Sequence, residues 1–419
     1  MTPSTSGRRR WLYLAGLMLG GESIYMLAYM RKTFQTSMES VLDVSSTQLG
    51  LLNTAFGILA LLSYFPSGWL ADRFPARHLL GISLVTTGAN GLFLLATPGF
   101  YGLLAIHGLW GLTSILMFWG ALIKAVREWG PPQRQGLSFG GLEAGRGVVA
   151  AGLASLATVG YARAASAEAG LMTVIWIYSL APMTAGLLVW CLAPDAIGDN
   201  GRGGSETVGK RLGRVTAVLR LPQVWLLAAV VCAAYMLYLG SFAFPAFAER
   251  GFDQTKTFGA TLGTARDWMR PIAALAAGVV ADRMAPAPAI TAIFVLLIAV
   301  FASLALMPVS GLGLGVLWAQ VLLAALAVFA LRAIYFAVLE EAAIPLGHTG
   351  TAVGVISVVG FMPDAFAHLL AGWFADSFPG VTGYRYYFAL LAGVALAGSV
   401  AARVLRHLNR RLDGVAPAR

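Results

Sequence analysis

Long apolar runs separated by short polar loops dominate this chain. Most of the runs contain roughly 20 residues or more, the length that a helix needs to cross a bilayer. Apolar positions are continuous rather than alternating, so the runs are predicted to form helices and not barrel strands. The pattern predicts an all-α integral membrane protein with twelve transmembrane helices, at residues 11–33, 47–70, 79–97, 101–126, 137–160, 171–193, 222–247, 257–281, 288–307, 312–338, 350–373 and 384–404.

The polar positions divide these helices into two groups of six. Residues 194–221 form a polar stretch that begins rich in Gly, Asn and Ser and then becomes basic. This composition is typical of a flexible joint followed by a cytoplasmic basic segment. We predict an N-terminal six-helix bundle at 1–193, a cytoplasmic linker at 194–221 and a C-terminal six-helix bundle at 222–419.

The two groups of helices repeat one another in sequence. The second predicted helix of the first group ends in Ala71-Asp72-Arg73, and its counterpart in the second group ends in Ala281-Asp282-Arg283. Internal repeats of this kind occur in many secondary transporters, whose substrate site lies between the repeats near the bilayer midplane. The sequence therefore predicts two pseudo-symmetric bundles with a central site.

Composition and charge narrow the class further. Hydrophobic residues make up 58% of the 419 residues and charged residues 11%, whereas a soluble domain carries roughly 25% charged residues. The net charge of +10 does not indicate nucleic-acid binding, because the basic residues gather in short loops on one side and at the termini, as the positive-inside rule expects. This placement predicts a multi-pass protein of the cell inner membrane with both termini in the cytoplasm.

The sequence offers little for enzymatic chemistry. Cys191 and Cys232 fall within apolar runs, so we expect no disulfide, no metal site and no cofactor. A nucleotide-binding loop is absent from the sequence, which disfavours an ATP-driven pump. No Ser/His/Asp set is recognisable, so an enzyme is not expected.

One loop resembles a known family signature. The run from Gly68 through Asp72 and Arg73 to Arg77 is similar to the loop signature of the major facilitator superfamily, although Pro-Ala replaces the usual Gly-Arg-type turn. The resemblance implies the twelve-helix fold, with helices one, four, seven and ten lining the cavity. It also implies that Asp72, Arg73 and Arg77 form a cytoplasmic latch, and we extend this expectation to the weaker copy at Asp282 and Arg283.

A second run resembles one branch of that superfamily. The segment Tyr29-Met30-Arg31-Lys32-Thr33-Phe34 is similar to the first-helix region of the organophosphate:phosphate antiporters. The proline-containing signature of drug antiporters is absent from the fifth predicted helix. The resemblance implies an anionic substrate.

Buried charges indicate where a substrate binds. An ionisable side chain in the bilayer costs at least about 2.5 kcal/mol unless it faces protein or water. Arg146 and Arg270 are predicted near the midplane, and guanidinium groups suit bidentate binding of carboxylate, phosphate or sulfonate. Neutralisation of Arg146 by Glu143 remains an alternative. The predicted substrate ligands are Tyr25, Tyr29, Arg31, Lys124, Arg146, Tyr235, Tyr238, Arg266, Arg270 and Tyr335.

The first predicted helix leaves two cations as alternatives. An ideal helix places Glu22, Tyr25, Tyr29 and Lys32 on one stripe, with Arg31 on the opposite side. The family resemblance favours Arg31 as the ligand, whereas helical geometry favours Lys32. Both alternatives stay open, with Arg31 as the preferred one.

Three further residues are candidates for proton coupling. Glu22 and Asp364 lie near the predicted midplane, where burial and a nearby arginine change a carboxyl group's proton affinity in opposite directions. Static ion pairs are the alternative for both acids. His107 can titrate near neutral pH, or it packs as a polar residue between helices.

These observations predict a monomeric secondary transporter that moves a small organic anion by alternating access. The anion is a phosphorylated, sulfonated or carboxylated metabolite. Coupling is to protons or to a counter-anion, by symport or antiport. The alternatives are a proton-coupled carrier of a neutral or cationic compound, and a receptor of the same fold that binds a metabolite without transporting it.

Overall fold

A computed structural model describes residues 7–131, 135–193, 216–281, 286–309, 313–335 and 349–413. Within these ranges the regular structure is helical and contains no strand, which confirms the predicted all-α class. The helices of the first half are α1 Gly7–Met26, α2 Arg31–Leu42, α3 Ser46–Arg73, α4 Ala76–Leu92, η1 Phe93–Ala96, α5 Phe100–Gly111, η2 Leu112–Trp119, α6 Gly120–Trp129, α7 Gln135–Ala162 and α8 Ala167–Leu192. Those of the second half are α10 Pro222–Gly240, η4 Ser241–Ala243, α11 Phe244–Gly251, α12 Lys256–Ala281, α13 Pro286–Leu306, α14 Gly313–Ile334, α16 Thr349–Gly360, η7 Met362–Ala365, α17 Ala367–Ser377 and α18 Thr382–Asp413.

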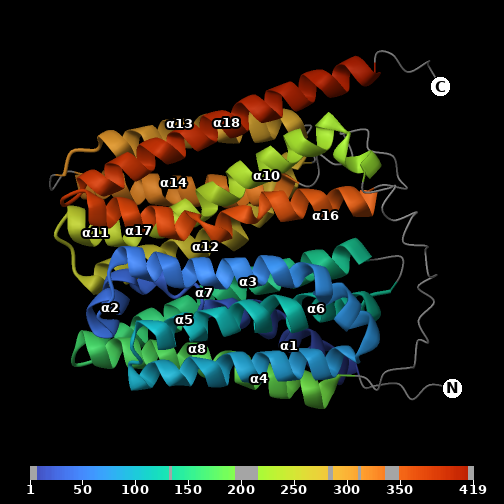
Figure 1. Ribbon diagram of the computed structural model, residues 1–419, viewed down its shortest axis with the longest axis horizontal. Coiled ribbons are helices and arrows are strands. Elements are labelled where there is room, and N and C mark those ends of the chain that lie inside the picture. The colour runs from blue at the N-terminus through green and yellow to red at the C-terminus, as the bar shows by residue number, and fades with distance from the viewer. Residues whose placement is uncertain are drawn as a thin grey trace.

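The helices are arranged as two bundles. Figure 1 shows α1 to α8 together in the lower part of the view and α10 to α18 in the upper part. The bundles meet mainly where α3 packs on α17 and where α7 packs on α12. Since α3 and α12 are each the second span of their half, and α7 and the α16–α17 segment each the fifth, these two contacts exchange under a pseudo-two-fold axis.

Ten described segments are long and apolar enough to cross a membrane, or eleven when α1 and α2 are taken together as one bent span. The remaining predicted span corresponds to α12. This helix of 26 residues carries Arg266, Asp267 and Arg270 near its middle. Most of the predicted linker lies outside the described residues.

Several spans are broken near their middle. α1 and α2 bend by 42° across residues 27–30, η4 separates α10 from α11, and η7 separates α16 from α17. Unwound backbone at membrane depth is tolerated where protein or a cavity surrounds it. The breaks place Tyr29, Ser241 and Asp364 in the interior between the bundles.

The contact of α3 with the broken span depends on two glycines. A Cβ atom at Gly57 would overlap the backbone carbonyl of Asp364, and one at Gly50 would overlap that of His368. Only glycine permits this close approach of two backbones. The contact fixes Asp364 against the first half.

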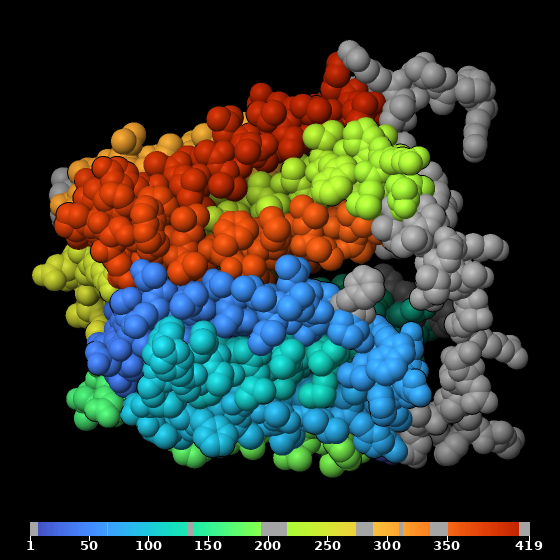
Figure 2. All heavy atoms as spheres, viewed as in Figure 1, coloured from blue at the N-terminus to red at the C-terminus, as the bar shows by residue number. Residues whose placement is uncertain are grey.

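The two ends of the molecule differ. We call the end where α1 begins and α18 ends the terminal end, at the right of Figure 1, and the end near α2 and α11 the distal end. In Figure 2 the halves are in contact toward the distal end, and the visible face is hollowed between them toward the terminal end. Large apolar side chains such as Leu62, Leu187 and Leu396 are exposed on the bundle surfaces, as expected for helices that face lipid.

Candidate functional site between the two bundles

Four ionised side chains form a closed cluster at the centre of the interface. Arg146 Nη1 lies 2.5 Å from Glu143 Oε1 and Arg146 Nη2 lies 3.4 Å from Glu22 Oε2. Arg270 Nη1 lies 2.9 Å from Glu22 Oε1 and Arg270 Nη2 lies 3.4 Å from Glu143 Oε2. The first three residues come from α1 and α7, and Arg270 comes from α12 of the other half. We call Glu22, Glu143, Arg146 and Arg270 the central cluster; its formal charge is zero.

The central cluster is open to solvent at one member. The Glu143 side chain is 53% exposed, whereas the Arg146 and Arg270 side chains are 10% and 18% exposed. Arg146 also donates from Nε to the carbonyl of Gly21 at 2.9 Å. Both arginines are therefore held by buried partners, and the exposed Glu143 is the partner that another anion could replace.

Aromatic rings surround these charges. The Arg146 guanidinium lies 6.0 Å from the ring centroid of Tyr25 and 5.7 Å from that of Trp119. Trp119 ends η2, a π-helical stretch of eight residues; such stretches are frequent at functional sites. Tyr25 stacks on Tyr29, with 6.4 Å between ring centroids. An aromatic wall of this kind suits both cations and flat or ring-shaped ligands.

Arg332 on α14 differs from Arg146 and Arg270 because its close partners are aromatic rings rather than carboxylates. Its guanidinium lies 3.9 Å from the ring centroid of Tyr238 and 5.6 Å from that of Tyr235. Among the described residues it has no carboxylate within ion-pair distance, yet it interacts electrostatically with both Glu143 and Asp364. It is therefore a cation beside the central cluster that no described carboxylate contacts directly.

Asp364 joins the two halves through tyrosine hydroxyls. Tyr29 of the first half donates to Oδ1 at 2.9 Å, and Tyr235 of the second half donates to Oδ2 at 2.7 Å. His368 Nε2 lies 3.9 Å from Oδ1. Both oxygens of this carboxylate are occupied by neutral donors.

A second charged group lies deeper toward the distal end. Lys32 Nζ lies 2.7 Å from Asp267 Oδ2, and Arg266 Nη1 lies 2.8 Å from Asp267 Oδ1, with all three side chains almost fully buried. Arg266 also donates from Nε to Ser241 Oγ at 2.8 Å, and its guanidinium lies 4.7 Å from the ring centroid of Phe242. Lys32 belongs to α2 and Asp267 to α12, so this pair also bridges the halves.

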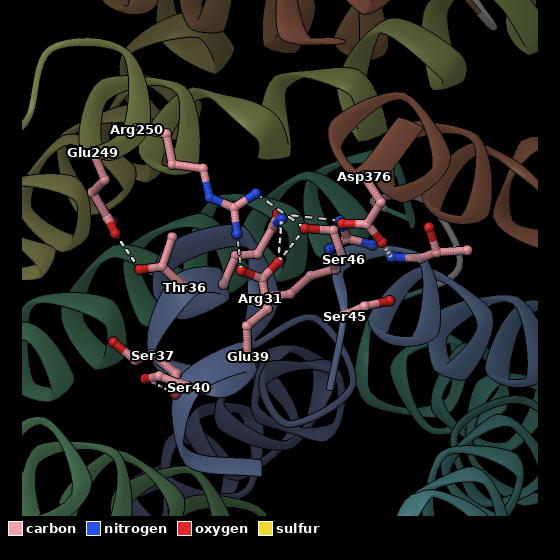
Figure 3. Close-up of polar contacts among 12 residues, drawn as sticks. Arg31, Thr36, Ser37, Glu39, Ser40, Ser45, Ser46, Glu249, Arg250 and Asp376 are labelled. Carbon is pink, nitrogen blue, oxygen red and sulfur yellow. Dashed lines mark hydrogen bonds and ion pairs between the residues drawn. The ribbon is translucent and has the colours of Figure 1, made fainter. Parts of the chain in front are cut away.

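Polar contacts close the distal end, as Figure 3 shows. Arg250 of α11 forms an ion pair with Glu39 of α2 and donates to Ser46 Oγ at 3.1 Å. Thr36 donates to Glu249, and Lys256 Nζ donates to Ser40 Oγ at 2.6 Å. The backbone N–H of Thr47 donates to Asp376 at 2.6 Å. We call these nine residues the distal contact; each bond in it joins one half to the other.

Neither cation of the α2 start faces solvent. Arg31 is 3% exposed and Lys32 is 5% exposed. Arg31 donates from Nη1 to the His368 carbonyl at 3.2 Å and from Nη2 to Gln35 at 3.1 Å. The bend between α1 and α2 turns both side chains into the interface, whereas an ideal helix would separate them.

The remaining predicted residues are not members of the central cluster. His107 is fully buried in the first half and its Nδ1 bonds to the Leu103 carbonyl at 2.9 Å. Lys124 donates to the Ala71 carbonyl at 2.9 Å, and Tyr335 is buried. Of the predicted latch, Asp72 and Arg73 are exposed at the end of α3 and Arg77 is on α4, while Asp282 and Arg283 lie outside the described residues.

The sequence prediction omitted two residues of this region. Arg332 was not among the predicted ligands, although its lack of a nearby acid in sequence was a usable signal. His368, four residues after Asp364, was not selected because only the broken helix brings it beside Tyr29, with 5.9 Å between ring centroids.

Comparison with known proteins agrees with this architecture. A family model described as Major Facilitator Superfamily matches residues 12–368. This chain belongs to the major facilitator superfamily. Two inner membrane proteins of Escherichia coli (strain K12) are similar to it: YihN is 28% identical over 406 residues, 95% of this chain and 96% of that protein, and YqcE is 28% identical over 408 residues, 94% and 93% respectively.

Solved structures of the superfamily fold match as well. A bacterial homolog of the human lysosomal transporter Spinster gives a TM-score of 0.72 at 15% identity, covering 99% of this chain and 100% of that one. The nucleoside transporter NupG gives 0.70 at 14% identity, covering 94% and 98%. Identity this low shows the shared fold alone. Family and fold together indicate a multi-pass membrane transporter with a small-molecule substrate, rather than an enzyme.

Proposed function

We propose that this superfamily member is a secondary active transporter of a small organic anion, which carries a phosphate, sulfonate or carboxylate group. The observation that carries the proposal is Arg332, a cation without a described carboxylate partner beside a cluster whose own charges cancel. A bound anion would give this guanidinium a direct partner. The resemblance of Tyr29 to Phe34 to the organophosphate:phosphate antiporters supports the same substrate class.

Binding would proceed by exchange at the central cluster. A substrate anion takes the place of the exposed Glu143 on Arg146 and Arg270, because guanidinium groups bind planar anions through two parallel hydrogen bonds. Glu22, which is 9% exposed, keeps its contacts behind the site. Tyr25, Tyr235 and Tyr238, with Lys124 and Tyr335 toward the edge, would contact the remainder of the substrate.

Transport would alternate between two openings. The distal contact holds the halves together at one end, and the visible hollow lies toward the other. Arginines gather at the terminal end, among them Arg9, Arg73 and Arg403. The positive-inside rule assigns this end to the cytoplasm, and the names of the two Escherichia coli relatives favour the inner membrane. The state described here would then be open toward the cytoplasm.

Coupling would pass through Asp364. Protonation removes its charge and one of the acceptor sites that Tyr29 and Tyr235 use, which weakens the bond between the halves. Proton symport or antiport then follows from linking protonation to opening. Exchange with a counter-anion at the arginines is the alternative. The protein would act as a monomer, since each bundle supplies one side of the site.

A substitution at Asp364 separates these two forms of coupling. Asparagine keeps an acceptor but cannot exchange a proton, so Asp364→Asn is expected to abolish accumulation driven by a pH gradient while anion exchange continues. Uptake into proteoliposomes, with and without a pH gradient, measures this. If the variant accumulates substrate like the unchanged protein, Asp364 does not carry the coupling proton.

A carrier of a neutral compound is the second candidate. It is favoured by the ion pairs that already neutralise Arg146 and Arg270. A matched pair of substrates separates the candidates: sugar phosphates, sulfonates and carboxylates against their uncharged parent compounds, offered to proteoliposomes. Uptake of the charged member is expected. Uptake of only the neutral member would reject the anion proposal, and saturable binding without uptake would indicate a receptor.

A further inference from the structure

A second pocket lies at the terminal end of the first half, away from the central cluster. Its volume is about 310 Å³, and its walls come from the first turns of α1 and α4 and the last turns of α6 and α8. Arg9, Arg10 and Arg77 line it together with Tyr13, and Glu128 is the single acid among its described lining residues. The described lining therefore carries more basic than acidic side chains.

Arg9 and Arg10 are held in place by backbone carbonyls at the ends of neighbouring helices. Arg10 donates from Nη2 to the Trp129 carbonyl at 2.6 Å, and the Trp129 indole donates to the Arg10 carbonyl at 3.1 Å. Arg9 donates from Nη2 to the Cys191 carbonyl at 3.4 Å. These carbonyls lie at the C-terminal ends of α6 and α8, so they orient the guanidinium groups but supply no counter-charge.

Tryptophans place the pocket at the membrane–water boundary. The ring centroids of Trp11 and Trp129 are 5.5 Å apart, and Trp11 is 65% exposed. Trp190, also partly exposed, contacts His78 on α4. Tryptophan is enriched at the level of the lipid headgroups. A charged pocket at this level meets the phosphate groups of the leaflet directly.

We propose that this pocket binds a phosphate group, either on an anionic lipid headgroup of the adjacent leaflet or as free phosphate. Arg9 and Arg77 supply charge-assisted hydrogen bonds to its oxygens, Arg10 adds positive charge, and the Tyr13 hydroxyl is a further donor. Basic pockets between membrane helices recognise lipid headgroups in this way. The site is separate from the transport site, so it is independent of the identity of the substrate.

Ligand-induced stabilisation of the purified full-length protein in a neutral detergent tests the proposal, since a ligand that binds the folded state raises its thermal unfolding temperature. The probes are phosphatidylglycerol, phosphatidylcholine and inorganic phosphate. The test variant combines Arg9→Gln with Arg77→Gln. The matched control combines Arg403→Gln with Arg406→Gln on α18, which also lie at the terminal end of the molecule. Arg9→Lys with Arg77→Lys keeps the charge and checks that the pocket still folds.

Stabilisation by phosphatidylglycerol, absent with phosphatidylcholine and lost only in the Arg9/Arg77 glutamine variant, supports the proposal and identifies the lipid as the source. The same pattern with inorganic phosphate supports it with a soluble source. If phosphatidylglycerol and inorganic phosphate each stabilise the glutamine variant as much as the unchanged protein, the proposal is overturned. Equal loss in the α18 control also overturns it, because the effect would then be general surface charge. A lysine variant that behaves like the glutamine variant counts against a charged site.

Discussion

The central cluster and the distal contact both consist of charged residues at the same interface, yet they differ in what surrounds them. In the distal contact, polar groups of opposite halves bond directly, and Arg250 pairs with Glu39. In the central cluster, one carboxylate is half exposed, and Arg332 beside it has no described acid within ion-pair distance. The first arrangement is suited to holding the halves together, and the second to accepting another anion. Under the proposed function, similar residues therefore serve closure at one level and substrate binding at the next.

The largest effect, a loss of thermal stability, is expected where a charge is buried between the halves without access to water. Asp267→Asn leaves Lys32 and Arg266 without their anion, and breaking a buried ion pair in this way costs about 3 to 5 kcal/mol. Thermal unfolding in detergent should therefore begin at a much lower temperature. Asp253→Asn is the control, since Asp253 is exposed and its left-handed backbone suits asparagine. Equal unfolding temperatures for the two variants would mean that the Lys32–Asp267 pair contributes little.

A smaller effect, a gain in substrate affinity, is expected when the exposed member of the central cluster is changed. Glu143→Gln removes the competitor for Arg146 and Arg270, so the affinity for a substrate anion should rise. A half-exposed pair is worth about 0.2 to 1 kcal/mol, which corresponds to roughly a 1.4- to fivefold lower KM for uptake. Glu168→Gln on the surface of α8 is the control. An unchanged or higher KM would argue that the anion does not replace Glu143.

The smallest effect, a shift toward the state open at the distal end, is expected when the distal contact is weakened. Glu39→Gln removes the ion pair with Arg250, which retains its bonds to Ser46 and to the Tyr384 hydroxyl at 3.0 Å. The loss of about 0.5 kcal/mol should raise the population open at the distal end about twofold. Labelling of Thr33→Cys, a buried position on α2, by a thiol reagent applied from that side reports this, in a background with both native cysteines changed to serine. No increase in the labelling rate would show that this pair does not restrain opening.

Much of the fold follows from the sequence because apolar length alone identifies membrane helices. The repeat of Ala71-Asp72-Arg73 at Ala281-Asp282-Arg283 indicated two bundles, and the buried charges indicated a site between them. Helical rise placed Glu22, Arg146 and Arg270 at one depth, and the structure brings them together. Their pairing could not be read from the sequence, because Arg270 reaches the cluster from the opposite bundle.

The choice between Arg31 and Lys32 was beyond the sequence for a different reason. The directions of the two side chains depend on the 42° bend across residues 27–30. That segment contains no proline or glycine from which the bend could be predicted. The same bend carries Tyr29 to Asp364, 335 residues later in the chain. Contacts made by broken helices depend on tertiary packing, and the periodicity of a straight helix does not predict them.

The anion site is tested most directly by uptake kinetics of Arg332→Gln in proteoliposomes, with Arg403→Gln as the matched control. A charge-assisted hydrogen bond contributes about 1.5 to 3 kcal/mol, so KM for the anionic substrate should rise by about tenfold or more, and Arg332→Lys should restore part of the loss. Uptake of an uncharged parent compound, where it occurs, should not change. Unchanged KM for the anion in Arg332→Gln, with the protein folded and inserted as before, would contradict anion binding at this site.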